Sequence, residues 1–125
     1  MKPISALFLL LGMSAAVFAG DVTALMKSPS VVYRLRASTG AFLGQMQPSG
    51  GVLAVGCDGE TVAVLSPRGV VSRYQAETGA FLGQMQPGSG CTDVQVSGGV
   101  ILVRSPHLVR RYDARTGAFL GQNQF

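Results

Sequence analysis

The sequence predicts an all-β domain of about three four-stranded units that follows an N-terminal signal helix. The heptad Thr-Gly-Ala-Phe-Leu-Gly-Gln occurs three times without change, starting at Thr39, Thr78 and Thr116, so its copies are 39 and 38 residues apart. Beyond the leader, no segment repeats apolar side chains with the period of an amphipathic helix. Short runs rich in β-branched residues recur instead between turn residues, as is typical of a repetitive β-structure.

Residues 1–19 have the organisation of a secretory signal peptide. Lys2 supplies a positive charge, residues 4–18 are apolar or small, and Val17 and Ala19 stand at the −3 and −1 positions of a cleavage site. The apolar run of about 15 residues is shorter than the roughly 20 residues that a membrane-spanning helix needs. We therefore expect cleavage after Ala19, a secreted or periplasmic domain of residues 20–125 in a bacterial cell envelope, and no stable membrane span after cleavage.

The charge of the domain beyond the leader is mild. Nine lysines and arginines face six acidic residues there, without the strongly basic balance of a nucleic-acid-binding domain. Nucleic acid is therefore not an expected partner. The arginines at equivalent repeat positions are interpreted as a solvated strand face; they are Arg34, Arg36, Arg73, Arg110, Arg111 and Arg115.

The second repeat, about residues 51–89, shows the expected strands most clearly. Asp58-Gly59 is a turn of the kind that closes hairpins, Ser66-Pro67 ends a strand because proline cannot donate to a ladder, and Thr78-Gly79 supplies a turn glycine. These turns separate four strands, at residues 53–57, 61–65, 70–74 and 80–85.

The two flanking repeats are aligned with the second. The third repeat, about residues 90–125, contains all four strands, starting with residues 92–96. The first repeat, about residues 22–50, begins with a counterpart of the second strand at residues 22–26, so the first strand is missing. The alignment predicts about eleven strands in total.

Four short strands every 38 to 39 residues are typical of a β-propeller blade. Residues 111–121, Arg-Tyr-Asp-Ala-Arg-Thr-Gly-Ala-Phe-Leu-Gly, resemble the tyrosine, aspartate, turn, threonine-glycine motif of bacterial β-propeller repeat proteins of the pyrroloquinoline-quinone-like, YVTN and NHL types. The resemblance covers nearly all of the domain and implies that Asp113 begins the hairpin between the two outer strands. It implies an architecture only, because many unrelated functions share such blades.

The sequence departs from the quinoprotein-like pattern in two respects. It has no tryptophan, the residue that docks one such blade on the next, so we expect this packing from Leu43, Leu82 and Leu120 with the phenylalanine before each. The hairpin aspartate occurs only at Asp113, which is interpreted as an Asx turn rather than a metal or cofactor ligand. No catalytic residue, cofactor site or metal site is predicted.

Three blades leave two open edges, because propellers close with roughly four to eight blades. Three outcomes stay open. Two chains could associate into a six-bladed ring, the chain could fold as an open β-structure, or the sequence could be a fragment or remnant of a longer propeller gene.

Cys57 and Cys91 are a possible disulfide. The repeat alignment places them at opposite ends of the first strand, about five residues apart, and this exceeds the Cα separation of roughly 4.4–6.8 Å that a disulfide needs. A bond becomes the better interpretation if the chain does not form a propeller. His107 is interpreted as a surface turn residue, because no cysteine or histidine cluster with metal-ligand spacing accompanies it.

Glutamines in the fourth strands are the candidate partner-binding residues. Within each strand they are two residues apart, so they share one face, which is either a binding surface or a plain solvent face. They are Gln45, Gln47, Gln84, Gln86, Gln122 and Gln124.

We expect an exported, non-enzymatic binding or scaffolding module that self-associates or docks on another cell-envelope protein. One alternative is a lectin-like carbohydrate binder with one site per repeat. Another is a small outer-membrane-associated β-protein, for which the aromatic C-terminal residue Phe125 is the observation. An enzyme of quinoprotein or hydrolase type is disfavoured, because the sequence lacks the cofactor ligands and the length to enclose a site.

Overall fold

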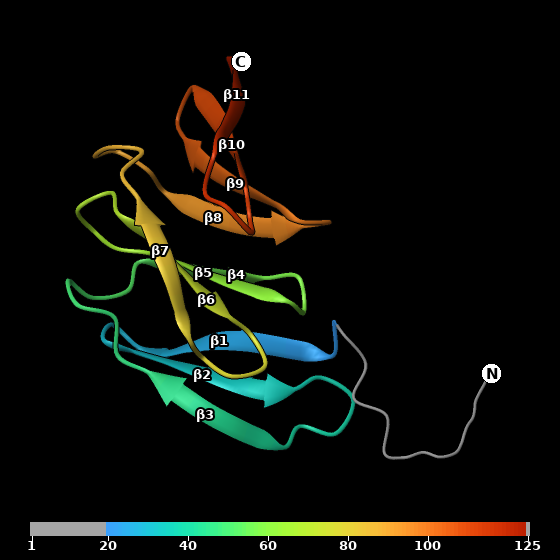
Figure 1. The fold of residues 1–125 in the computed structure, drawn as a ribbon. Helices are drawn as coiled ribbons and strands as arrows, with labels where there is room; N and C mark the ends of the chain where they lie inside the picture. The colour runs from blue at the N-terminus through green and yellow to red at the C-terminus, as the bar shows by residue number, and fades with distance from the viewer. Residues whose placement is uncertain (1–19, 125) are drawn as a thin grey trace.

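The computed structural model describes residues 20–124, so the predicted leader and Phe125 lie outside the described residues. Eleven strands form three separate antiparallel sheets (Figure 1). This confirms the prediction of an all-β fold with two four-stranded repeats and one three-stranded repeat. Within the described range, no helix is long and apolar enough to cross a membrane.

Each sheet is one repeat and is called a blade here. Its strands follow one another in chain order and pair antiparallel with their neighbours. Blade 1 contains β1 (Val22–Ser28), β2 (Val31–Arg36) and β3 (Phe42–Met46). Blade 2 contains β4 (Ala54–Cys57), β5 (Thr61–Leu65), β6 (Val71–Gln75) and β7 (Phe81–Met85). Blade 3 contains β8 (Asp93–Ser97), β9 (Val100–Ser105), β10 (Leu108–Asp113) and β11 (Phe119–Gln124).

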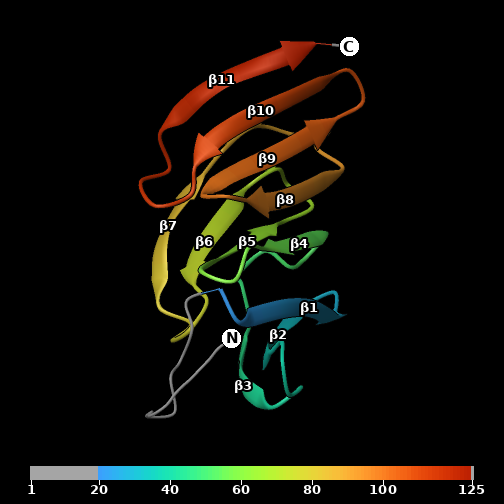
Figure 2. The same cartoon turned by 90° about the vertical axis from the view of Figure 1, so that its right-hand side faces the viewer.

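The apolar core lies between the blades. Blades 1 and 3 pack on opposite sides of blade 2 (Figures 1 and 2), so every residue of β5 is buried. Alternate residues of a strand face opposite sides, and β5 therefore contributes to two cores. Val62 and Val64 belong to the core shared with blade 1, whereas Ala63 and Leu65 belong to the core shared with blade 3.

The heptad forms the hairpin between the third and fourth strands. In blade 2, the Thr78 hydroxyl accepts a hydrogen bond from the Ala80 N–H at 3.2 Å, and Gly79 has φ +78°. In blade 3, Asp113 adds the predicted Asx turn, because its carboxylate accepts the N–H groups of Arg115 and Thr116. These hydrogen bonds lower the pKa of Asp113. Turn chemistry thus explains the first half of the heptad.

Both cysteines are free thiols that bond to backbone carbonyls. Cys57 Sγ donates to the Val22 carbonyl in blade 1 at 3.2 Å, and Cys91 Sγ donates to the Gly88 carbonyl at 3.1 Å. No disulfide therefore contributes to the fold of residues 20–124.

The expectation that the heptad phenylalanines dock one blade on the next is wrong. Phe42, Phe81 and Phe119 are 59%, 59% and 55% exposed, and each lies edge-on to the tyrosine of its own blade. Of the leucines that follow, Leu43 packs against the core between blades 1 and 2, whereas Leu82 and Leu120 are exposed. Another residue joins the blades at this end.

Candidate functional site

One arginine in each of the first two blades, Arg34 and Arg73, hydrogen-bonds to the hairpin of the next blade. Arg34 of β2 is 6% exposed, and its Nη1 donates to the carbonyls of Ala76 and Glu77 in blade 2, at 2.9 and 3.1 Å. These carbonyls lie in the hairpin between β6 and β7. The guanidinium of blade 1 therefore holds the outer hairpin of blade 2 in place.

Arg73 of β6 repeats this contact between blades 2 and 3. It is also 6% exposed, and its Nη1 donates to the carbonyls of Ala114 and Arg115 at 3.1 and 3.0 Å. Its Nη2 donates to the Leu82 carbonyl of its own blade at 3.3 Å. The prediction of a solvated arginine face is therefore wrong for Arg34 and Arg73.

The second glycine of the heptad makes room for this guanidinium. Gly83 faces Arg73 across the β6–β7 pair and has φ +146°, and a Cβ there would lie 2.6 Å from Arg73 Nη2. Gly121 stands in the same relation to Arg111, with a Cβ distance of 2.5 Å. A glycine inside a strand and opposite an arginine is thus the sequence signal for the blade contact.

Arg111 of β10 holds the same position in blade 3 but has no following blade. It is half-buried, and its Nε has no partner, as in Arg34 and Arg73. Among residues 20–124, no hairpin carbonyl receives its Nη groups, because blade 3 is the last blade described. The molecule therefore presents one blade-joining guanidinium at an open end.

The free face of blade 1 is the opposite open end. Register pairs Leu25 with Tyr33 and Thr23 with Leu35, so these residues share the side of the sheet that faces away from blade 2. Leu25 is 40% exposed, and Tyr33 and Leu35 are half-buried. Blade 1 also lacks a counterpart of β4 or β8 among the described residues, which leaves one edge of β1 unpaired.

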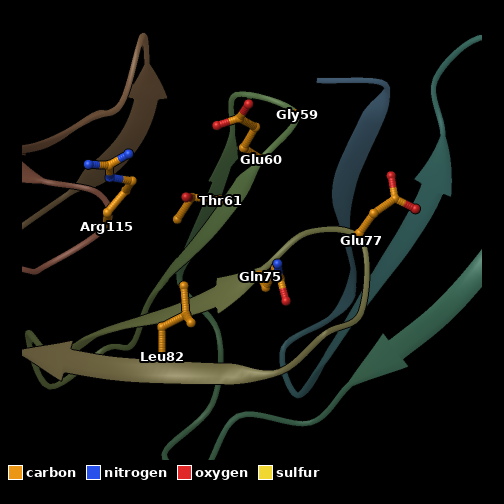
Figure 3. A pocket seen from close by; sticks show the side chains of 7 residues that line it. All are labelled: Gly59, Glu60, Thr61, Gln75, Glu77, Leu82 and Arg115. Carbon is orange, nitrogen blue, oxygen red and sulfur yellow. The ribbon is translucent and has the colours of Figure 1, made fainter. Parts of the chain in front are cut away.

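An open cleft of about 450 Å³ lies at the hairpin ends of blades 2 and 3 (Figure 3). Side chains of both charges line it; the residues are Gly59, Glu60, Thr61, Gln75, Glu77, Leu82 and Arg115. Glu77 is already paired with Arg36 at 2.8 Å, and this hydrogen bond lowers the pKa of Glu77. Arg115 approaches the cleft from blade 3, on the side opposite Glu77. The cleft therefore brings together two carboxylates, Glu60 and Glu77, and the guanidinium of Arg115.

The other predicted candidates are scattered over the surface. The six glutamines are exposed on β3, β7 and β11 or just beyond them, while Met46 and Met85 between them are buried. His107 is exposed in the turn between β9 and β10. Within the part of the chain that the structure describes, no three acidic, histidine or cysteine side chains form a group that could hold a metal ion.

Comparison with known proteins finds structures of similar fold but no match to the sequence. Neither a protein-family model nor a curated protein sequence matches the chain. Among solved structures, BamB from Moraxella catarrhalis matches with a TM-score of 0.69 and 17% identity, over 84% of this chain and 33% of that chain.

Two further structures match at similar levels. A europium-containing methanol dehydrogenase has a TM-score of 0.63 and 18% identity, over 84% of this chain and 23% of that chain. The computationally designed Ika4 protein has a TM-score of 0.66 and 17% identity, over 85% of this chain and 68% of that chain. The chain thus spans about a third of BamB. At these identities the likeness shows the β-propeller blade fold over about three blades.

Proposed function

We propose that the chain is an exported, non-enzymatic interaction module that binds through the blade faces at its two ends. One observation carries this proposal. Leu25 on the free face of blade 1 is 40% exposed, whereas its equivalents Val64 in blade 2 and Val103 in blade 3 are each 1% exposed. Blade 1 leaves uncovered the kind of apolar face that blades 2 and 3 bury.

Physical chemistry favours a partner for this face. Contiguous exposed apolar groups on soluble proteins mark interaction surfaces, and an unpaired strand edge invites a further chain. Leu25, Tyr33 and Leu35 lie together on the free face, beside the unpaired edge of β1. Burying them against a partner would contribute hydrophobic free energy, as burial of the equivalent side chains does at the two internal junctions.

The remaining parts of the proposal have separate support. Export is supported by the charged, apolar and small-residue order of residues 1–19. The non-enzymatic part of the proposal is supported by the exposed turn position of His107, the single histidine of the sequence.

Site-specific photo-crosslinking in a bacterial host tests this function. A photoreactive phenylalanine at position 25 should give an adduct of discrete mass from the periplasmic or secreted fraction, and Leu35→Glu should abolish it. The same group at Arg68, an exposed residue of the β5–β6 turn, is the matched control and should give no adduct. Absence of an adduct at position 25, or retention of the protein in the cytoplasm, would contradict the proposal.

A second candidate function is carbohydrate binding with one site per repeat. The supporting observation is the set of exposed aromatic rings at equivalent positions, Phe42, Phe81 and Phe119, since sugars stack on such rings. Titration calorimetry against a panel of glycans should then give heat with a stoichiometry near three, reduced to near two by Phe81→Ala. No heat with any glycan would dispose of this candidate.

A further inference from the structure

We propose that the partner of the interaction module is a second copy of the chain, joined head to tail. Blade 3 of one copy docks on blade 1 of the other, and Arg111 donates to the carbonyls of Ala37 and Ser38 in the β2–β3 hairpin of that copy. This inference rests on the proposed function and names its partner.

Each of the three blades has one such arginine donor and one such hairpin acceptor. Arg111 is the donor, and the hairpin of blade 1 the acceptor, that makes no such contact within residues 20–124. Arg34 and Arg73 donate to hairpin carbonyls of the next blade, and Arg111 is their equivalent over Gly121. The hairpins of blades 2 and 3 each accept at the alanine and at the residue after it.

Blade 1 has the same hairpin, and its acceptors are free. Gly40 has φ +76°, against +78° and +80° for Gly79 and Gly117. Ala37 and Ser38 are exposed, and their N–H groups bond to Asp21. Their carbonyls have no donor within residues 20–124.

The polar residues on the free face of blade 3 match the strand that blade 1 lacks. In blade 2, Ala54 and Leu65 pack in the core with β8, the innermost strand of blade 3. Blade 3 carries Asp93 and Arg104 at these two positions, by the β4–β5 and β8–β9 registers. Against blade 1, which has no innermost strand among the described residues, both side chains would stay in solvent.

A glycine of blade 2 shows the same relation. At Gly56 a Cβ would lie 2.9 Å from Gln95 Cα, so the innermost strands of blades 2 and 3 approach too closely for a side chain. The equivalent residue of blade 3 is Gln95 itself. Its side chain excludes an innermost strand at that distance but fits against blade 1, which has none among residues 20–124.

Residues around the start of the innermost strand also favour a junction between blade 3 and blade 1. Met46 shares a core with Val52, and Met85 shares a core with Cys91; Val52 and Cys91 precede β4 and β8. Blade 3 has Asn123 in place of the methionine. Asparagine suits a junction with blade 1, in which residues 20–124 include no counterpart of Val52 or Cys91.

The positions that would face strands present in blade 1 keep their character. Val109 is the equivalent of Val71, which is fully buried between blades 2 and 3, and Arg111 is the equivalent of Arg73. Val109 and Arg111 would meet the free face of blade 1, where Leu25 is exposed. Apolar and hydrogen-bonding groups are thus retained where a partner strand exists, and polar groups appear where it does not.

Two such junctions close the assembly. A twofold axis would place blade 3 of each copy against blade 1 of the other and make a ring of six blades, within the range of roughly four to eight that propellers adopt. The two open ends of each chain are then both covered.

Sedimentation equilibrium tests the junction. The wild-type protein should have twice the mass of one chain. Arg111→Leu and Leu25→Glu should each weaken association by at least about 100-fold, since each removes a buried contact from both junctions. Arg115→Leu is the matched control, because it removes an exposed charge outside the junction, and it should leave the dimer intact. Circular dichroism shows whether each variant keeps its β-structure.

Two results would overturn the junction. One is a wild-type protein that stays monomeric at about 100 µM, and the other is a dimer that Arg111→Leu does not weaken. The crosslinking experiment separates these failures from failure of the proposed function. An adduct at position 25 with a mass other than that of two chains overturns the junction but supports the interaction module, whereas no adduct removes both.

Discussion

Arg73 and Arg111 stand at the same position of consecutive repeats, and their surroundings differ in one respect. Both lie over a glycine of the fourth strand, Gly83 or Gly121. Arg73 is 6% exposed and donates to two carbonyls of blade 3, whereas Arg111 is half-buried and has no following hairpin among residues 20–124. Blade 3 therefore carries the same half of a junction as blade 2, with no following blade among residues 20–124.

Replacing the two arginines by leucine should give the largest contrast. Arg73→Leu should lower the free energy of unfolding by about 3 to 4 kcal/mol, because it removes charge-assisted hydrogen bonds and leaves the Ala114 carbonyl buried without a donor. Arg111→Leu should cost less than about 1 kcal/mol when both are compared in a monomeric Leu25→Glu background. Urea unfolding measures both, and equal losses would contradict the assignment.

The glycines beneath these arginines should show a smaller contrast. Gly83→Ala should destabilise by about 2 kcal/mol, because alanine is strained at φ +146° and its Cβ displaces the Arg73 guanidinium. Gly121→Ala carries similar strain at φ +153°, but Arg111 can turn into solvent, so the loss should be about 1 kcal/mol in the monomeric background. Thermal unfolding of both glycine variants in the monomeric Leu25→Glu background checks this order. A larger loss at Gly121 would reverse the comparison.

The junction between blades 1 and 2 should depend on pH. The hydrogen bond from Arg36 lowers the pKa of Glu77, so the ionised carboxylate stabilises the folded state at neutral pH. This contribution is lost as the pH falls through the lowered pKa of Glu77. The stability advantage of wild type over Glu77→Gln should therefore shrink from pH 7 to pH 3. The junction between blades 2 and 3 has Gln75 and Arg115 at these positions, so Gln75→Ala should show no such trend.

The smallest effect concerns the thiols at the two internal junctions. Burial raises the pKa of Cys57 and of Cys91, which reduces the thiolate fraction of each at pH 8. Alkylation by iodoacetamide should be several-fold slower in the folded protein than in urea, where both thiols should react. Recovery of no free thiol in urea without reductant would contradict the free cysteines of the structure.

The period of the repeat is enough to predict most of the fold from the sequence. The features that it does not predict depend on contacts between residues far apart in the chain. The spacing of the three heptads and the alignment of the repeats predict the blades and the three-stranded first repeat, because strands and turns depend on neighbouring residues. The buried state of Arg34 and Arg73 depends on carbonyls 42 and 41 residues away, which no local pattern reveals. The glycine opposite each arginine was the available signal.

The exposed phenylalanines are the opposite case, because residue type predicts burial and the structure shows exposure. Phe81 has a large apolar side chain, which is typical of a core residue. It nevertheless begins β7 directly after the hairpin, on the outer edge of the blade. The ring of Tyr74 lies edge-on to it, and Phe81 stays 59% exposed. Position in the sheet, which the repeat alone does not show, decides its exposure.

Mixing two defective variants tests the head-to-tail junction most directly. Arg111→Leu impairs only the blade 3 face, and Leu25→Glu impairs only the blade 1 face, so a pair of the two variants retains one intact junction. Sedimentation of an equimolar mixture should show a one-to-one complex that neither variant forms with itself. A mixture that stays monomeric while the wild-type protein is dimeric would contradict the head-to-tail arrangement.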